Sequence, residues 1–269
     1  MSESKSVSSI RRWRAFLIAP PSGEVSMRLW LAHVAILLFL FSLLSWVLLA
    51  SEGLRFTSFW DYRIAFWWGW LTTILCSLIA LFISLLLGFL TALARRSRIL
   101  PLRALAGIYV QAVRGTPLLV LILFGFYIFA NQIGLQDRFV AGVLILSLFS
   151  GAYMAEIIRA GIESVGRTQI ESARSLGFTP LQIYRYVVFP QALRQMLPPL
   201  AGQLASLIKD SSLLSIISIS EFTFAAQQVA SATYGTFESY LVLLVGYLIL
   251  TLPIMALTHY FERRNTFDT

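Results

Sequence analysis

The feature that most constrains this chain is a series of apolar runs, each about long enough to cross a lipid bilayer as a helix. Six such runs occur in the sequence, at residues 29–50, 67–94, 105–130, 139–160, 186–207 and 240–260. A soluble domain of 269 residues could not cover itself, because 58% of the residues are hydrophobic and only 13% are charged. The sequence therefore predicts an all-α integral membrane protein with six transmembrane helices.

A seventh apolar stretch, residues 213–229, contains Glu221, Gln227 and Gln228. Polar side chains are costly in lipid, so we expect this stretch to be re-entrant or interfacial rather than a span. The first run, in contrast, exceeds the roughly 7 to 15 apolar residues of a secretory signal, and we expect it to remain as a membrane helix.

Arginine and lysine residues are distributed unequally between the two ends of the predicted helices. Sixteen lie on the side that also holds both termini, and four lie on the opposite side. Because positively charged loops tend to stay in the cytoplasm, both termini are predicted to be cytoplasmic. The net charge of +8 is thus explained by membrane orientation, and nucleic-acid binding is not expected. Four tryptophans then fall in the outer aromatic belt, namely Trp60, Trp67, Trp68 and Trp70.

The predicted cytoplasmic segment 161–185 carries signals for a short helix. Ile170, Ala173 and Leu176 recur every three residues, so they share one face of a helix of two turns. A helix this short is unstable alone in water and needs a surface to pack against. We infer a docking element rather than an unstructured loop.

Signals for a stop and a new start follow within a few residues. Gly177 is the residue type that most readily takes the left-handed conformation at a helix end. Thr179, Pro180 and Gln182 provide an N-cap hydroxyl, a proline in the first turn and the partner residue of a capping box. The sequence therefore predicts two short helices separated at Gly177.

The residue order in this segment resembles the EAA motif of membrane permease subunits in ATP-binding-cassette importers. That motif reads E-A-A, three residues, G, nine residues and I-x-L-P; here "ESA" at 171–173, Gly177 and "VVFP" at 187–190 keep the spacing. The departures preserve small size or apolar character. Further stretches resemble the polar amino-acid permease branch of that family: "VRGTPLL" (113–119), "SGAYMAEIIRAGI" (150–162), "PQALRQMLPPL" (190–200) and "KDSSLLSII" (209–217).

The resemblance covers roughly residues 67–260 and implies the five-helix core of a type I importer within residues 60–264. The helix at 29–50 is then an addition, and the implied cytoplasmic tails are residues 1–28 and 265–269. Such a permease lies in the bacterial inner membrane and forms the translocation path for polar amino acids. The residues of the implied coupling helix are Glu171, Ser172, Ala173, Arg174, Leu176 and Gly177.

The resemblance also implies partners. A dimer of separate ATPase subunits would bind ATP and magnesium, a periplasmic or extracellular binding protein would deliver the solute, and a second permease, identical or merely similar, would complete the path. The chain has no G-x-x-x-x-G-K-[ST] motif, so we expect neither a nucleotide cofactor nor enzymatic activity in it.

Ionisable side chains at membrane depth are costly and are therefore functional candidates. The residues predicted to line the solute path are Arg114, Thr116, Tyr153, Glu156, Lys209 and Ser211. One hypothesis is that Arg114 or Lys209 faces the carboxylate of a zwitterionic solute while Glu156 faces its ammonium group. The alternative is that Glu156 forms a structural ion pair with Arg114 or Arg159, and that Lys209 only extends to the membrane interface.

Two other functional classes agree less well with the sequence. An ion-coupled secondary transporter acting alone would need paired carboxylates at the midplane and usually an internal repeat, and the sequence shows neither. A membrane-embedded enzyme would need a nucleophile–base set, but His33 and His259 are remote from each other and no metal site is expected. Cys76 lies in an apolar run and is expected to be a small buried residue.

Overall fold

The computed structural model describes residues 60–265 and a few isolated earlier positions, namely 35, 38, 39, 41, 42 and 45. The predicted tail 1–28, almost all of the predicted helix 29–50 and residues 266–269 lie outside the described residues. The predictions for His33 and for the sidedness of the N-terminus fall there too.

The chain divides into two compact units, Met1–Arg55 and Phe56–Thr269. In the described part of the second unit every regular element is helical. The elements are α4 (Arg63–Arg95), α5 (Leu100–Arg114), α6 (Leu118–Phe124), η1 (Gly125–Ala130), α7 (Arg138–Glu163), α8 (Arg167–Ser175), α9 (Pro180–Ile183), η2 (Tyr184–Val188), α10 (Phe189–Asp210), η3 (Ser211–Ile217), α11 (Phe222–Thr233) and α12 (Thr236–Asn265).

Four helical segments of the described chain are long and apolar enough to cross a membrane. They are Arg63–Arg95, Arg138–Glu163, Pro180–Ile217 and Thr236–Glu262. A fifth span results if the bent pair α5 and α6–η1 is counted as one. The apolar runs 67–94, 139–160, 186–207 and 240–260 fall within these four segments, and the fold of the described chain is that of a multi-pass, all-helical membrane protein.

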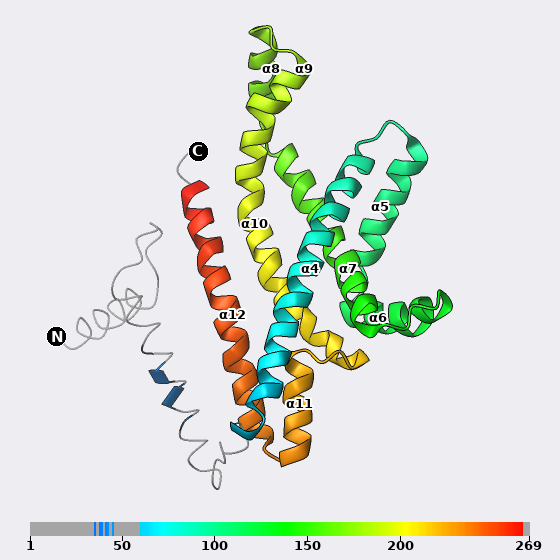
Figure 1. Cartoon of the computed structure of the whole chain (residues 1–269). Coiled ribbons are helices and arrows are strands. Elements are labelled where there is room, and N and C mark those ends of the chain that lie inside the picture. Colours follow the sequence, from blue (N-terminus) through cyan, green and yellow to red (C-terminus); the bar gives the residue numbers. More distant parts are fainter. Residues whose placement is uncertain (1–34, 36–37, 40, 43–44, 46–59, 266–269) are drawn as a thin grey trace, which may run out of the picture. The chain divides into compact units, whose positions relative to one another are not determined.

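The prediction of one helix over residues 105–130 is wrong. The chain bends by 108° between Leu100–Arg114 and Leu118–Ala130, and α6 lies across the direction of α4 in Figure 1. The break falls at Gly115-Thr116-Pro117, where Pro117 has an extended ψ of 137° and no N–H to continue the helix. The proline therefore redirects the chain instead of merely loosening the helix.

Small side chains allow α4 and α7 to approach each other closely. A Cβ on Gly88 would lie 2.4 Å from the Cβ of Met154, and Thr73, Ser77 and Ser84 are fully buried on α4. Large apolar side chains point the other way, and Phe82 is 74% exposed. This arrangement, with small residues inside and large apolar residues outside, is expected where the surrounding solvent is lipid.

The stretch 213–229 falls in η3 and α11: residues 213–217 end the candidate span Pro180–Ile217, whereas α11 is not among the helices suited to span a membrane. Glu221 is fully buried at the N-terminus of α11, and its carboxylate accepts hydrogen bonds from the backbone N–H groups of Thr223 and Phe224. It also accepts bonds from the hydroxyls of Tyr247 on α12 (3.1 Å) and Thr73 on α4 (3.4 Å). One carboxylate thus joins three helices.

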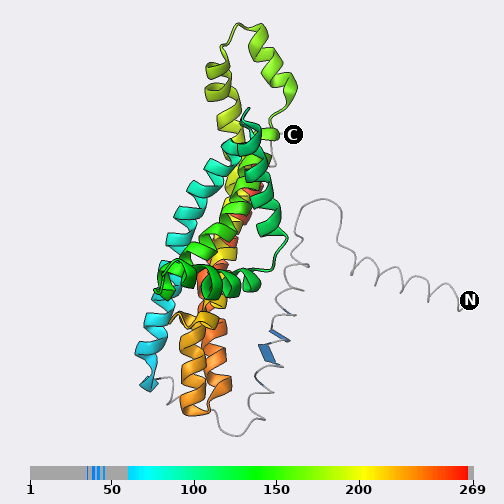
Figure 2. The same cartoon turned by 90° about the vertical axis from the view of Figure 1, so that its right-hand side faces the viewer.

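Helices α8 and α9 form a hairpin that projects beyond the ends of α4, α5 and α7 (Figures 1 and 2). Helix α12 ends toward the same end of this unit (Figure 1). The predicted docking segment is therefore the outermost part of the unit at that end.

Candidate functional site

The projecting hairpin has the stop and the start that the sequence predicted. Gly177 has a φ of +81°, and the N–H groups of Gly177 and Phe178 donate to the carbonyls of Arg174 (2.9 Å) and Ala173 (3.1 Å). Residues that favour left-handed conformations end helices in this way. Helix α9 then opens with a complete capping box between Thr179 and Gln182. Both predictions are confirmed.

The apolar face of α8 differs from the prediction. Ala173 is only 5% exposed, and it packs with Ile170, Ile183 and Val188 in a core cluster of this chain, whereas Leu176 is 77% exposed. The three residues of the predicted apolar face therefore separate: Ile170 and Ala173 pack inward, and Leu176 faces outward. The surface that a two-turn helix needs is supplied by the chain itself, mainly by α9 and η2.

The outer face of the hairpin combines charged, small and apolar side chains. Glu171, Ser172, Arg174 and Gly177 are exposed together with Leu176. Beyond α8, Phe178 and Leu181 are 40% and 77% exposed. Exposed apolar side chains ringed by polar ones are typical of a protein docking surface.

Inside the helical bundle, Glu156 on α7 is surrounded by arginines from three helices. It forms an ion pair with Arg95 at the end of α4, pairs with Arg159 at 2.7 Å and lies 3.8 Å from Arg114 at the end of α5. Arg159 also pairs with Glu163 on its own helix. The ion-pair alternative therefore describes the observed arrangement, with Arg95 as a member that the sequence reasoning missed.

Tyr153 lies beside this cluster, and Thr116 follows Arg114 by two residues in the chain. The Arg114 guanidinium lies 5.2 Å from the centre of the Tyr153 ring, a cation–π geometry. Thr116 donates its hydroxyl to the carbonyl of Ala112 at 2.8 Å, so its hydrogen bond is made to its own chain segment. The structure thus brings Arg114, Tyr153 and Glu156 together.

A cavity of about 420 Å³ lies beside Glu156, between α7 and α10. Besides Glu156, its lining includes Ser164 of α7's C-terminal end and Gln195 of α10. Gln195 was not singled out from the sequence, where it is one uncharged residue among several in "PQALRQMLPPL". Gln195 reaches the site because α10 lies beside α7 in the fold, and its residue type alone does not indicate this.

Lys209 and Ser211 lie elsewhere. Ser211 is fully buried and donates its hydroxyl to the carbonyl of Ile208 at 2.8 Å, while Lys209 is exposed. Lys209 is ten residues beyond Pro199, which lines the cavity, and both residues lie on α10. Ten residues of an α-helix span about 15 Å along its axis. The six predicted path residues therefore do not form one site.

Potential metal ligands do not gather anywhere in the described chain. No group of three or more His, Cys, Asp and Glu side chains suitable for a metal occurs between residues 60 and 265. His259 is exposed beside Glu262 at 3.1 Å, and Cys76 is a buried free thiol.

Comparison with known proteins extends these observations. Residues 84–267 match the family model "Binding-protein-dependent transport system inner membrane component". The "Probable glutamine ABC transporter permease protein GlnM" of Bacillus subtilis (strain 168) is 40% identical over 73% of this chain and 91% of its own length. The "L-cystine transport system permease protein TcyB" of the same organism is 37% identical over 71% of this chain and 82% of its own length.

Solved structures are also similar to this chain. A chain in "Crystal structure of an amino acid ABC transporter with histidines" is 38% identical, with a TM-score of 0.74 over 79% of this chain and 100% of that one. A chain of an inward-facing methionine transporter, MetNI, is 20% identical with a TM-score of 0.59, over 77% of this chain and 96% of its own length, which shows a shared fold.

Proposed function

The chain belongs to the family of inner membrane components of binding-protein-dependent transport systems, and from this premise we propose that it forms the translocation path for a polar amino acid. The relatives' names mention glutamine and L-cystine, and the similar solved structure is an amino acid transporter. Members of this family are permease components without catalytic activity. The proposed arrangement is six helices, with both termini cytoplasmic, in the bacterial inner membrane.

The exposed face of α8 is the observation that carries the coupling part of the proposal. Glu171, Ser172, Arg174 and Leu176 are presented at the end of the projecting hairpin, and Gly177 and the capping box fix their position. A rigid projection with mixed charged and apolar side chains can transmit movement from a neighbouring protein through η2 to α10, which follows η2 in the chain. We assign that neighbour as a dimer of ATPase subunits, which bind the ATP and magnesium.

The solute path requires further partners. A second permease, either another copy or a similar chain, would face this one around the path, and an extracytoplasmic binding protein would deliver the solute. In this chain the cavity beside Glu156 is the proposed contact region. Glu156 is the one charged side chain among the described residues that line this cavity, and the guanidinium groups of Arg95, Arg114 and Arg159 lie around its carboxylate.

Glu171→Lys in the reconstituted complex tests the coupling. Reversing this exposed charge leaves the core of α8 intact, because Glu171 lies outside the packed cluster. We expect the complex to assemble and to hydrolyse ATP without the matching solute uptake. Glu262→Lys is the matched control, since Glu262 is also an exposed glutamate but lies on α12.

Equal uptake per ATP hydrolysed in Glu171→Lys and wild type would refute the assignment of α8 as the coupling element. Uptake by the purified chain alone, driven by an ion gradient, would favour the alternative, a secondary transporter. Co-purification followed by mass measurement distinguishes one permease species from two.

A further inference from the structure

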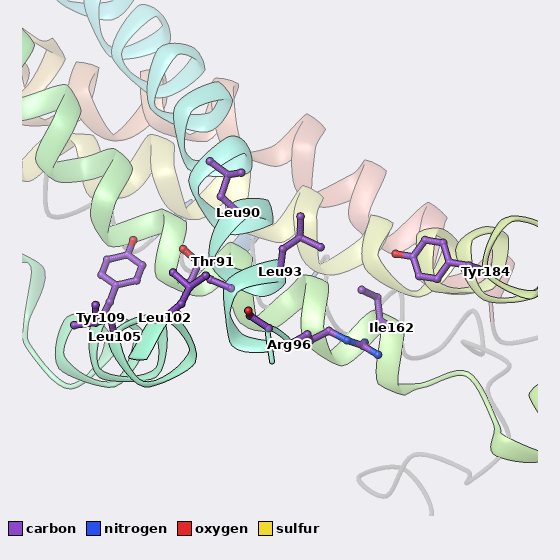
Figure 3. A pocket seen from close by; sticks show the side chains of 12 residues that line it. Leu90, Thr91, Leu93, Arg96, Leu102, Leu105, Tyr109, Ile162 and Tyr184 are labelled. Atoms are coloured by element: carbon purple, nitrogen blue, oxygen red, sulfur yellow. The ribbon is translucent and has the colours of Figure 1, made fainter. Parts of the chain in front are cut away.

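A large pocket lies at the end of the bundle that carries α8, outside the region proposed for solute. Its volume is about 860 Å³, and it is bounded by the end of α4, the first turns of α5, the end of α7 and the start of η2. Figure 3 shows leucine side chains from α4 and α5 along its wall. Leu90, Leu93, Leu102 and Leu105 are all between 43% and 65% exposed, so this wall is open to the surroundings.

One end of the pocket is polar and cationic. The Arg96 side chain extends toward Ile162, and the Tyr184 hydroxyl points back toward the same end (Figure 3). Ser97 also lines the pocket. None of the lining residues carries a negative charge, and Arg96 forms no ion pair within the described residues.

We propose that this pocket binds an anionic phospholipid, with the headgroup phosphate at Arg96 and Tyr184 and an acyl chain along the leucines. A guanidinium and a hydroxyl suit a phosphate oxygen, and the aliphatic wall suits a hydrocarbon chain. A free phosphate would use the cationic end alone and would leave the leucines without a partner. A second copy of this chain, whose net charge is +8, offers poor charge complementarity to an end that is already cationic.

The position of this lipid has a mechanical consequence. Tyr184 is the first residue of η2, which follows α9 and packs against α8 through the cluster around Ala173. A bound headgroup would therefore contact the segment that holds the projecting hairpin. This inference concerns lipid binding and does not depend on the proposed solute or on ATP coupling.

Lipid titration by native mass spectrometry tests the proposal on the full-length chain, purified and delipidated in detergent. We expect phosphatidylglycerol to bind more tightly than phosphatidylcholine. Arg96→Gln should weaken phosphatidylglycerol binding about fivefold, the effect of one surface charge. Leu102→Trp, which narrows the apolar part without changing any charge, should weaken the binding of both lipids.

Arg98→Gln is the matched control, because Arg98 is exposed in the same turn but does not line the pocket. Equal weakening by Arg96→Gln and Arg98→Gln would overturn the proposal in favour of diffuse attraction. Equal affinity for the two lipids would also overturn it, as would a crosslink from Leu105→Cys to a second permease copy, which would make the pocket a subunit interface. Unchanged elution in size-exclusion chromatography confirms that each variant is folded.

Discussion

At the scale of single residues, Glu156 shows why an ionisable group can persist inside a membrane helix. An unpaired carboxylate in such surroundings would be strongly disfavoured, but here Arg95, Arg114 and Arg159 approach it from three helices. Glu156 also lines the adjacent cavity, where it is the one charged side chain among the described lining residues. Structural pairing and a role in the solute path are therefore compatible for this residue.

Replacing Glu156 by glutamine removes the charge that holds these arginines together. Because the side chain is only 18% exposed, we expect the free energy of unfolding to fall by about 1.5 to 3 kcal/mol, the range for hydrogen bonds to charged groups. The measurement is unfolding in mixed detergent micelles, together with solute uptake by the assembled complex.

Glu163→Gln is the control for this prediction. It also loses a pairing with Arg159, but its side chain is 55% exposed, so the expected change is only about 0.3 to 0.5 kcal/mol. Equal stability of Glu156→Gln and wild type would show that the cluster contributes nothing to the fold. Unchanged solute affinity and rate would remove Glu156 from the proposed path.

At the scale of elements, the α8–α9 hairpin depends on a single backbone conformation. Gly177 has a φ of +81°, and a Cβ added there would meet no atom within 4 Å, so only backbone strain opposes a larger residue. Gly177→Ala should therefore cost about 1 to 2 kcal/mol. We expect this strain to loosen the hairpin and to lower solute uptake per ATP hydrolysed.

Gly107→Ala provides the matched substitution. Gly107 lies within α5, and a Cβ there also has open space, but its conformation is an ordinary helical one. Alanine should then stabilise the chain by about 0.5 to 1 kcal/mol. Thermal unfolding measures both variants, and a Gly177→Ala variant as stable as Gly107→Ala would contradict the role given to the positive φ.

The sequence predicted elements where the signal was local. Apolar length located the spans, and Gly177, Thr179 and Gln182 located the stop and start of the hairpin because capping depends on residues within a few positions. The 108° bend at Pro117 was missed, since a proline in an apolar run permits both a kink and a complete break. The inward face of α8 was assigned to a partner because nothing local shows that η2 folds back against it.

Site residues were harder to predict for the same reason. Glu156 and Arg114 were found because charges stand out in an apolar run. Arg95 was counted only as an orientation signal, and Gln195 carries no charge at all. Their contribution comes from the meeting of α4, α5, α7 and α10, which are distant in sequence.

At the scale of the whole helical unit, two buried or half-buried glutamates hold α4 at two places along its length. Toward one end, Glu156 joins α4 to α5 and α7 through arginines. Toward the other, Glu221 joins α4 to α11 and α12 through Thr73 and Tyr247. Between these two places, α4 packs on α7 through small residues such as Gly88, which allow close approach of the helices but contribute little polar attraction. The polar contacts therefore supply directional bonds at two separate places along the longest described helix.

Glu221→Ala tests the second of these connections. The variant loses the N-cap of α11, usually worth about 0.5 to 2 kcal/mol, and leaves the hydroxyls of Thr73 and Tyr247 without their acceptor at about 1 to 3 kcal/mol. We expect a total loss of about 2 to 4 kcal/mol in the free energy of unfolding in mixed micelles.

Glu221→Gln keeps one acceptor oxygen and should lose less, while Glu262→Ala, at an exposed glutamate of α12, should change little. If Glu221→Ala unfolds like Glu262→Ala, the carboxylate does not hold α11 against α4 and α12, and apolar packing around Phe222 alone must do so.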